Sequence, residues 1–308
     1  ECCQYNQNFN MKIFIQKNTR SYSPEIYAYK QYLEKYNYNV DIGFQDEYSH
    51  NYDALMLLMG FFPNYMVKKF DSIKIIHEYS SLSLYPFSKF KNLLKHYFNS
   101  IPDARIFNSE IIKKDLYFSN KIPYVFRDTG IDDIFFNNYN INKDFDFVYS
   151  GSTNSVRKGL LNCIENILKA GFSVLVVGKV SSDVYNYFKK YNKIEFTGFQ
   201  EYKYLPEIYQ RAKYGLNFTP NLYPLNLQES TKTKEYCASG LKVVSNEYKW
   251  VSQFESINNA KFLWYDPSLT QEKIHNYNFV VPNVKKYSWN YIFNDIKFIS
   301  FIDRIFNT

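Results

Sequence analysis

From Met11 onward the sequence alternates short apolar runs with longer amphipathic stretches. Short β-branched and aromatic runs are typical of buried parallel strands, and apolar residues at every third or fourth position are typical of helices. Their alternation predicts βαβ units around parallel sheets, which is an α/β fold. The predicted strands of the first set span residues 11–16, 40–43, 54–59, 73–77 and 104–108, with helices at 24–36 and 86–99 and Ser109 as the N-cap of another.

A second set of the same units follows residues 137–144, an Asn-rich stretch that is polar and has no periodicity. Its predicted strands span residues 145–149, 173–177, 194–197, 214–218 and 241–245, and its helices span 158–170, 183–191, 205–212 and 231–239. The sequence therefore predicts two Rossmann-like doubly wound domains that face each other across a cleft. A chain of 308 residues is long enough for both.

The predicted N-terminal domain spans residues 11–136, the linker 137–144 and the C-terminal domain 145–287. Residues 288–308 carry an apolar and aromatic helical pattern, which we expect to cross back and brace the N-terminal domain. Residues 1–10 are polar and precede the first strand pattern, so we interpret them as an extension or a cloning remnant.

The net charge of +7 indicates an anionic partner, which leaves a nucleotide diphosphate, a phospholipid surface or a nucleic acid. The sequence has no basic run and no aromatic RNA-binding signature, so nucleic acid is the least supported of the three. The four cysteines lack zinc-like spacing, which fits a reducing cytoplasm and predicts no metal site. The apolar runs are too short for a membrane span.

The strand at 145–149 leads into a loop of small residues that contains Gly151 and Ser152. The helix that follows begins with two cations, Arg157 and Lys158. Backbone amides and positive charge therefore converge where an anion such as a diphosphate can bind. The alternative is an ordinary strand-to-helix turn with two solvated cations.

A second segment places Lys232 and Glu235 three positions apart on one predicted helix, so that both lie on the same face. Ser230 or Thr231 is expected to cap this helix, and Gly240 to end it. Lys232 offers a cation to a phosphate, and Glu235 offers a carboxylate that accepts hydrogen bonds from a ribose diol. The alternative is a surface helix whose charges are only solvated.

Four stretches, taken in order, resemble the retaining GT-B glycosyltransferases of the family 4 type, especially bacterial enzymes of surface polysaccharide biosynthesis. The first is Arg157, Lys158 and Gly159, and the second is the strand end at Gly178 and Lys179. The third is residues 196–198 together with 205–209. The fourth is made of Lys232, Glu235, Tyr236, Ala238, Gly240, Val243 and Val244.

The resemblance implies a glycosyltransferase of the hexosyltransferase type, EC class 2.4, that uses a nucleotide sugar donor and no metal or other cofactor. It implies that Glu235 binds the donor ribose, and that Arg157 with Lys232 or Lys158 neutralises the leaving diphosphate. Gly151, Ser152, Gly178, Ser230 and Thr231 complete the expected donor-binding set. Fixed cations at a leaving group stabilise its developing charge without reorganising.

One position departs from the family. Many members carry two glutamates, the first of which touches the donor sugar, but the earlier position here is Leu227. Glu229 is close but offset. We expect Gln228, Glu229 or a backbone amide to take over this role, with Glu229 as a catalytic candidate.

The first half resembles the family's acceptor domain more loosely. His77 ends a predicted strand where the family places a histidine near the reacting centre, so it is the acceptor-side and catalytic candidate. The alternative is a structural histidine with satisfied hydrogen bonds. Glu78 is the candidate general base, and Arg20, in the loop after the first strand, is a second acceptor-side candidate.

Residues 87–98 are basic and aromatic at helical spacing. Such a helix can lie on an anionic membrane with Phe90, Leu94 and Tyr97 in the apolar layer and its lysines at the headgroups. That placement suits a lipid-linked acceptor and the cytoplasmic face of the plasma membrane. The alternative is a helix packed into the core with a solvated basic face.

The sequence thus predicts transfer of a sugar from a nucleotide diphosphate donor to a hydroxyl of a glycan or lipid-linked glycan, in lipopolysaccharide or capsule assembly. Two alternatives stay open, because one architecture hosts several chemistries. The first is a GT-B-fold nucleotide-sugar epimerase. The second is a non-catalytic scaffold of a polysaccharide-assembly complex, which the missing first glutamate keeps open.

Overall fold

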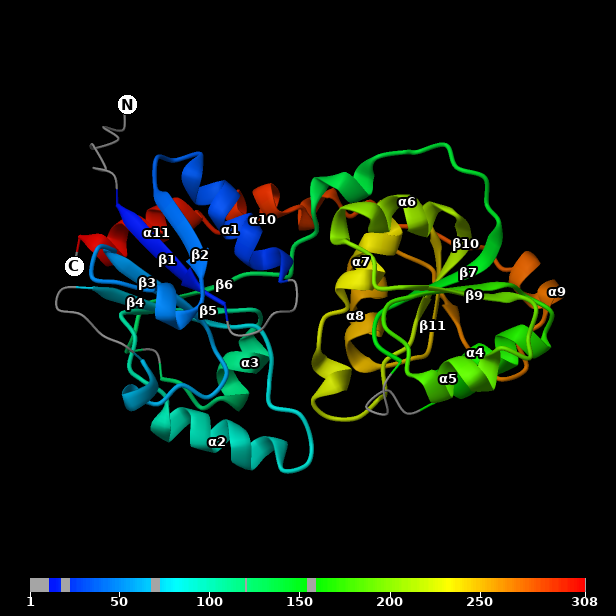
Figure 1. The fold of residues 1–308 in the computed structure, drawn as a ribbon, viewed down its shortest axis with the longest axis horizontal. Helices are drawn as coiled ribbons and strands as arrows, with labels where there is room; N and C mark the ends of the chain where they lie inside the picture. Colours follow the sequence, from blue (N-terminus) through cyan, green and yellow to red (C-terminus); the bar gives the residue numbers. More distant parts are fainter. Residues whose placement is uncertain (1–10, 18–22, 68–72, 120, 154–158, 308) are drawn as a thin grey trace. The chain divides into compact units, whose positions relative to one another are not determined.

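The computed structural model describes residues 11–17, 23–67, 73–119, 121–153 and 159–307. The chain divides into two compact units (Figure 1). The first unit comprises the chain up to Gly130 together with Trp289–Thr308, and the second unit comprises Ile131–Ser288. The predicted extension at residues 1–10 lies outside the described part of the chain.

The first unit is built on a parallel sheet in the order β2-β1-β3-β4-β5-β6. Its strands are β1 (Lys12–Gln16), β2 (Asn39–Gly43), β3 (Ala54–Leu58), β4 (Lys74–Tyr79), β5 (Ala104–Phe107) and β6 (Tyr124–Phe126). Its helices are α1 (Pro24–Glu34), α2 (Ser88–Phe98), α3 (Glu110–Asp115), α10 (Trp289–Asp295) and α11 (Phe298–Phe306), with 3-10 turns η1 (Gln45–Glu47) and η2 (Asn64–Met66). Alternate strand residues face two cores: Ile13 and Met56 face one, Phe14 and Leu55 the other.

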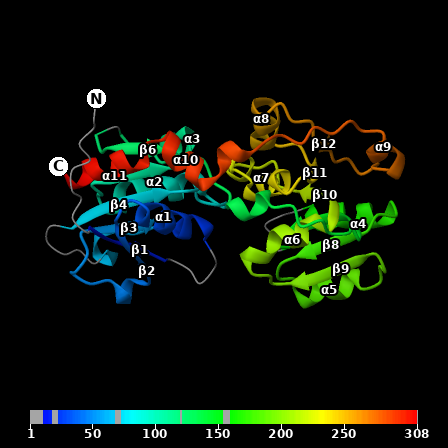
Figure 2. The ribbon, with the colours of Figure 1, turned by 90° about the horizontal axis from the view of Figure 1, so that it is seen from above.

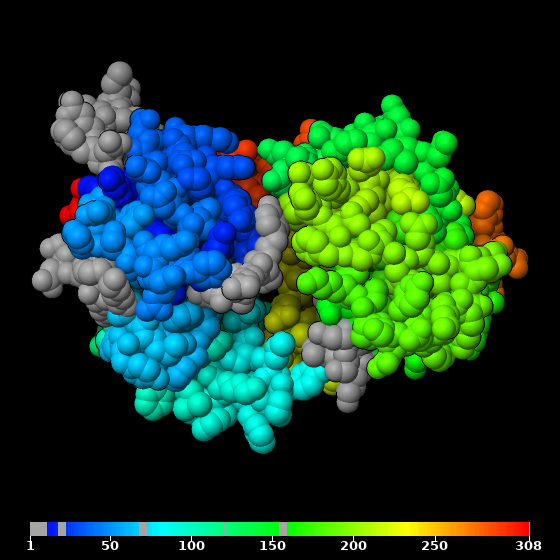
Figure 3. Space-filling model, viewed as in Figure 1, coloured from blue at the N-terminus to red at the C-terminus, as the bar shows by residue number. Residues whose placement is uncertain are grey.

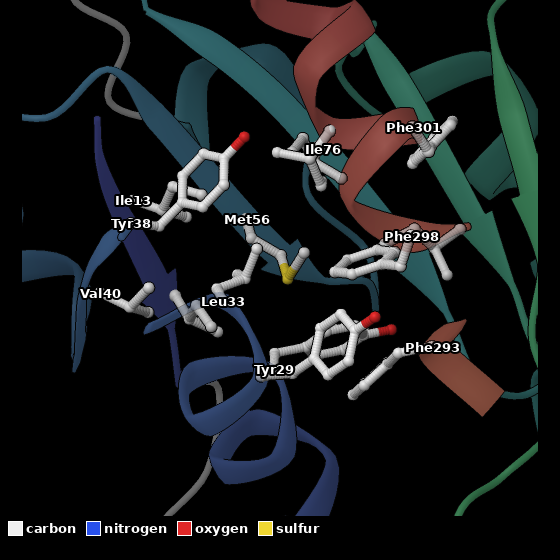
Figure 4. Close-up of a cluster of buried hydrophobic side chains, with 14 of the residues drawn as sticks. Ile13, Tyr29, Leu33, Tyr38, Val40, Met56, Ile76, Phe293, Phe298 and Phe301 are labelled. Atoms are coloured by element: carbon white, nitrogen blue, oxygen red, sulfur yellow. The ribbon is translucent and has the colours of Figure 1, made fainter. Parts of the chain in front are cut away.

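The last two helices of the chain complete the first unit. Figures 1 and 2 show α10 and α11 beside α1, over one face of the sheet. Figure 4 shows Phe293 and Phe298 against Tyr29, with ring centroids 5.0 Å and 5.3 Å from the tyrosine ring. Instead of one long helix, the structure has two helices that meet at Lys297, whose φ of 51° is left-handed.

The boundary between the units lies at Gly130, before the predicted linker. The backbone of residues 137–144 is held by hydrogen bonds within the second unit. Tyr139 N donates to Gln210 Oε1 at 2.9 Å, and Gln210 Nε2 donates to the Asn137 carbonyl at 2.6 Å. The Lys143 side chain also donates from Nζ to the Ala212 carbonyl at 3.0 Å. Polar contacts hold this stretch instead of apolar packing, so it needs no apolar periodicity.

The second unit contains a parallel sheet in the order β12-β11-β10-β7-β8-β9. Its strands are β7 (Phe145–Ser150), β8 (Val174–Val177), β9 (Ile194–Gly198), β10 (Ala212–Asn217), β11 (Lys242–Ser245) and β12 (Leu263–Trp264). Its helices are α4 (Leu160–Lys169), α5 (Ser182–Phe188), α6 (Leu205–Gln210), α7 (Thr231–Ala238), α8 (Lys249–Ile257) and α9 (Gln271–His275), with 3-10 turns η3 (Asp133–Phe136), η4 (Tyr202–Tyr204), η5 (Leu225–Leu227) and η6 (Lys285–Tyr287).

Helices cover both faces of the second sheet. Ile164 of α4 and Phe188 of α5 belong to the core on one face, while Tyr209 of α6, Tyr236 of α7 and Val251 of α8 belong to the core on the other. In Figure 1, α6 lies above the strands and α4 and α5 lie below them. Two doubly wound parallel sheets confirm the predicted fold class.

Most predicted elements are present, and their ends shift by a few residues. Ser109 caps α3, as predicted, by accepting a hydrogen bond from Ile112 N. The sequence did not predict β6, α8, β12 or α9, which are short or follow the last predicted strand. Within the described residues, the helices are all too short or too polar to span a lipid bilayer.

Candidate functional site

The candidate site lies at the switch point of the second sheet. β7 and β10 are neighbours, but the chain continues from β7 to β8 and from β10 to β11, on opposite sides. In open parallel sheets, ligands bind outside the carboxyl ends of the strands at this point. The loop that begins at Gly151 follows β7, and α7 is the first α-helix after β10, so the structure brings the two predicted donor-binding segments together here.

Lys232 and Gly151 make the closest link between these segments. A Cβ atom on Gly151 would lie only 3.3 Å from Lys232 Nζ, so the ammonium group sits directly beside this backbone. Lys232 Nζ also lies 4.5 Å from the centroid of the Tyr149 ring, in a cation–π contact. Aromatic faces attract cations, so Tyr149 helps to hold the charge at the carboxyl end of β7.

Gly178 packs against the same loop. A Cβ atom on Gly178 would lie 2.8 Å from the Gly151 carbonyl oxygen, and the two glycines have φ values of +129° and +131°. L-residues with side chains rarely adopt such values, so both positions favour glycine. Gly151 N donates to the Val177 carbonyl at 2.9 Å, and Gly178 N donates to the Gly198 carbonyl at 2.9 Å. These contacts hold the ends of β7, β8 and β9 close together.

The start of α7 is fixed by a buried polar cluster. Ser230 is the N-cap, as predicted, and its Oγ accepts from Thr233 N at 3.3 Å. Ser230 Oγ donates to Asn217 Oδ1 at 3.1 Å, and Asn217 Nδ2 donates to Ser245 Oγ at 2.9 Å. These bonds tie the helix to the ends of β10 and β11. Thr231, the first residue of α7, is half-buried.

Glu235 is buried, with 4% of its surface exposed, on the same helix as Lys232. Tyr202 Oη donates to its Oε1 and Tyr209 Oη to its Oε2, each at 3.1 Å. Burial raises the pKa of Glu235 to about 7, while the two tyrosine hydrogen bonds and Lys232 act in the opposite direction. A carboxylate can accept about four hydrogen bonds, and the two tyrosines use one on each oxygen.

Two tyrosines position the loop after β7. Tyr236, one residue beyond Glu235, accepts a hydrogen bond from Ser150 N at 2.9 Å. Tyr149 Oη donates to the Ser152 carbonyl at 2.9 Å, and the Ser152 side chain is exposed. Gly215 allows Tyr236 to lie this close to the sheet, because a Cβ atom there would meet the ring at 2.4 Å.

Glu229, the catalytic candidate of this unit, is paired. Lys234 Nζ lies 2.7 Å from Glu229 Oε2, and the Lys234 and Glu229 side chains are only 1% and 9% exposed. The same ammonium group lies 4.3 Å from the Tyr287 ring centroid. A carboxylate held by a buried cation supports a structural role more than a catalytic one. Gln228, at the end of η5, is half-buried and stays a candidate for the sugar contact.

His77 does not have the surroundings of an acceptor-side residue. It is fully buried within β4, with Nδ1 3.2 Å from Tyr79 Oη and Nε2 3.2 Å from Ser100 Oγ. A ring enclosed on both nitrogens has no open side for an acceptor hydroxyl. The structure supports the alternative of a structural histidine.

Glu78 is likewise an interior residue. It forms a buried ion pair with Arg127, which also donates to Tyr29 Oη at 2.6 Å and to Asn108 Oδ1 at 3.0 Å. Coulombic attraction to Glu78 helps to raise the pKa of Arg127 despite its burial. A carboxylate neutralised in this way is a poor general base, so the proposed base role of Glu78 has no support here.

Three predicted site residues lie outside the described part of the chain. Arg20 falls within residues 18–22, and Arg157 and Lys158 fall within residues 154–158. The resemblance-based roles of these three cations therefore stay predictions.

Sequence reasoning missed two of the side chains that hold the site together. Tyr202 and Asn217 contact the predicted residues directly, as does Tyr209, the last residue of the stretch 205–209. In a chain with 31 tyrosines, no local pattern singles out Tyr202. Among the described residues, no group of three or more His, Cys, Asp or Glu side chains is placed to hold a metal ion.

No protein-family model matches the sequence, and neither does any curated protein. Solved structures do match the fold. AviGT4, a glycosyltransferase involved in Avilamycin A biosynthesis, has a TM-score of 0.62 at 9% identity and covers 96% of this chain and 98% of its own. HepE from Anabaena, solved with UDP and glucose, has a TM-score of 0.58 at 12% identity, covering 96% and 98%.

The fold is not restricted to transferases. The UDP-GlcNAc 2-epimerase from Methanocaldococcus jannaschii has a TM-score of 0.51 at 12% identity and covers 94% of this chain and 100% of its own. Identities this low show a shared fold alone. The likeness confirms the prediction of two doubly wound domains of the GT-B type, and function has to be argued from the site.

Proposed function

We propose that this chain transfers a sugar from a nucleotide diphosphate donor to a hydroxyl of a glycan or lipid-linked glycan. The observation that supports it best is that Lys232 and Glu235 both lie on α7, at the switch point of the second sheet. The Lys232 ammonium group lies beside Gly151. A cation and a hydroxyl-binding carboxylate at this place match the two ends of a nucleoside diphosphate.

In the proposed reaction, Lys232 stabilises the charge that builds up on the diphosphate as the glycosidic bond breaks. Lys232 is held by Tyr149 and by the cap of α7, so it needs little reorganisation when the charge develops. Glu235 accepts hydrogen bonds from the ribose hydroxyls. Arg157 and Lys158 are expected to add further positive charge.

The finer parts of the proposal follow from the sequence resemblance. They are transfer of a hexose with retention at the anomeric carbon, no requirement for a metal, and a place in bacterial lipopolysaccharide or capsule assembly at the cytoplasmic face of the membrane. HepE, which has a similar fold and was solved with UDP and glucose, supports a UDP-sugar as the first donor to test.

Turnover tests the proposal directly. The protein is incubated with UDP- and GDP-sugars and candidate acceptors, and release of the nucleoside diphosphate is measured. Lys232→Ala is expected to lower kcat by about 100-fold or more, the scale found when a single stabilising group at a developing charge is removed. Lys189→Ala, which removes an exposed lysine at the end of α5, is the matched control. Equal turnover in both variants would contradict the assigned role.

The epimerase fold neighbour favours a second candidate function, epimerisation of a nucleotide sugar. Incubation of the donor without acceptor separates the two: an epimerase changes the sugar with no acceptor present, and a transferase does not. A non-catalytic scaffold would give no product in either assay and would bind neither UDP nor GDP in calorimetry.

A further inference from the structure

The helix α2 turns its aromatic side toward solvent. Phe90 is 60% exposed and Tyr97 is 70% exposed, and Leu93 lies between them on the same side. Phe87, before the helix, and Phe98, at its end, are 77% and 55% exposed. The alternative of a helix that packs these aromatic residues into the core is therefore wrong.

Polar residues anchor the opposite side of α2. Ser88 and Asn92 are buried, and Asn92 Oδ1 accepts a hydrogen bond from Ser83 N at 3.0 Å. A helix at the surface of a globular protein normally buries its apolar side and exposes its polar side. This helix does the reverse, so its apolar side has no partner among the described residues of the first unit.

A second segment extends this apolar surface. Phe61 and Tyr65 are exposed, Tyr65 by 84%. Their segment is tied to the end of α2, since Phe62 N donates to Asn99 Oδ1 and Ser100 N donates to the Phe62 carbonyl, both at 2.9 Å. We call the exposed side chains of these two segments the α2 surface; it consists of Phe61, Tyr65, Met66, Phe87, Phe90, Leu93, Tyr97, Phe98 and Ile101.

The two segments that form the α2 surface carry charges of one sign. Lys89 and Lys91 are exposed on α2. No Asp or Glu occurs in residues 79–102 or 54–70, the stretches that contain the two segments. Exposed aromatic residues together with lysines are typical of surfaces that bind anionic lipid headgroups.

We propose that the α2 surface docks on a lipid bilayer that contains anionic phospholipids. Phe90 and Tyr97 enter the boundary between headgroups and acyl chains, and Lys89 and Lys91 contact the headgroup phosphates. The α2 surface lies on the face of the first sheet opposite to α10 and α11. Ser100, just after α2, hydrogen-bonds His77 on one face of β4, whereas the adjacent Ile76 points to the other face, into the core that contains α10 and α11. In Figure 3, the cyan atoms of this region form a projecting lower edge of the first unit.

Vesicle flotation tests this docking, without donor or acceptor, so the result does not depend on catalysis. The full chain is mixed with vesicles of phosphatidylcholine alone or of phosphatidylcholine and phosphatidylglycerol in equal parts. The wild type is expected to float only with the anionic vesicles. Replacing both Phe90→Ser and Tyr97→Ser is expected to lower the apparent affinity by about tenfold or more, because the exposed rings lose their apolar contact.

A charge variant and a matched control complete the test. Replacing Lys89→Glu and Lys91→Glu is expected to lower the affinity about tenfold or more, since each lysine near an anionic surface contributes on the order of 1 kcal/mol. Tyr291→Ser on α10 removes a tyrosine of similar exposure, 53%, and is expected to bind as the wild type does. All four altered side chains of α2 are exposed, so folding should be kept.

Three outcomes would overturn the proposal. The first is equal flotation of the wild type and both α2 variants, and the second is no flotation with anionic vesicles at all. The third is a dimer of the wild type, measured by light scattering without lipid, that the Phe90→Ser and Tyr97→Ser replacements convert to a monomer. That result would identify a second copy of the chain as the occupant of the α2 surface.

Discussion

Gly178 lies so close to Gly151 that a single added methyl group would meet the Gly151 carbonyl oxygen at 2.8 Å. The carbonyl belongs to backbone, so it has little freedom to move away. Because Lys232 Nζ lies beside the same residue, this contact sets where the ammonium group meets the loop after β7. Gly151 therefore contacts both Gly178 and the Lys232 ammonium group.

Replacing Gly178→Ala is expected to lower the free energy of unfolding by about 1–3 kcal/mol, because the new side chain faces both an unfavourable φ and a backbone contact. Gly240→Ala is the control. Gly240 has a φ of +74° but no atom within 4 Å of an added Cβ. Gly240→Ala should lower the free energy of unfolding only by the cost of a left-handed alanine, about 1 kcal/mol. Urea unfolding measures both, and an equal or smaller loss for Gly178→Ala would contradict the contact.

Glu235 is expected to make stability depend on pH. Its folded pKa is raised from an ordinary value of 4.5 to about 7, so the folded protein holds this proton more tightly than the unfolded chain does. Stability should therefore fall as pH rises from about 4.5 to about 7 and then level off, by roughly 3 kcal/mol in all.

The Glu235→Gln variant isolates that contribution, because a buried amide carries no charge at any pH. Its free energy of unfolding, relative to the wild type, should increase with pH over the same interval. Glu207→Gln, on the exposed side of α6, is the control and should follow the wild type. Parallel pH profiles for the wild type and Glu235→Gln would show that Glu235 is ionised at little cost.

The buried ion pair between Glu78 and Arg127 is expected to contribute to the free energy of unfolding. Removing its charge by Glu78→Gln leaves the Arg127 guanidinium buried without its counter-ion, which typically costs about 3–5 kcal/mol. Glu34→Gln breaks the exposed Lys30–Glu34 pair, 2.6 Å long, and should cost less than about 1 kcal/mol. A stable Glu78→Gln protein that has lost all turnover would instead restore Glu78 as a candidate base.

The sequence predicted the helix that carries Lys232 and Glu235 because the signals for it are local. Lys232 and Glu235 are three positions apart, and helical periodicity alone places them on one face of α7. The capping role of Ser230 and the left-handed φ of Gly240 at the helix end are likewise local, and the structure confirms both.

The surroundings of His77 and Glu78 could not be read from local sequence. His77 and Glu78 looked like polar residues at a strand end, but β4 continues to Tyr79, so both lie inside the sheet. Their partners, Ser100 and Arg127, are distant in sequence and no short pattern reveals them. The contacts of residues 137–144 are non-local in the same way, since Gln210 hydrogen-bonds the backbone of Tyr139 and Asn137.

Calorimetric titration with UDP and GDP tests the central claim most directly, because it asks whether the carboxyl ends of β7 and β10 bind a nucleoside diphosphate at all. We expect at least one of the two to bind the wild type and the Lys189→Ala control equally. Lys232→Ala should weaken that binding by about tenfold or more, the loss expected for one charge-assisted contact. No binding of either nucleotide, or equal binding by Lys232→Ala, would contradict the account.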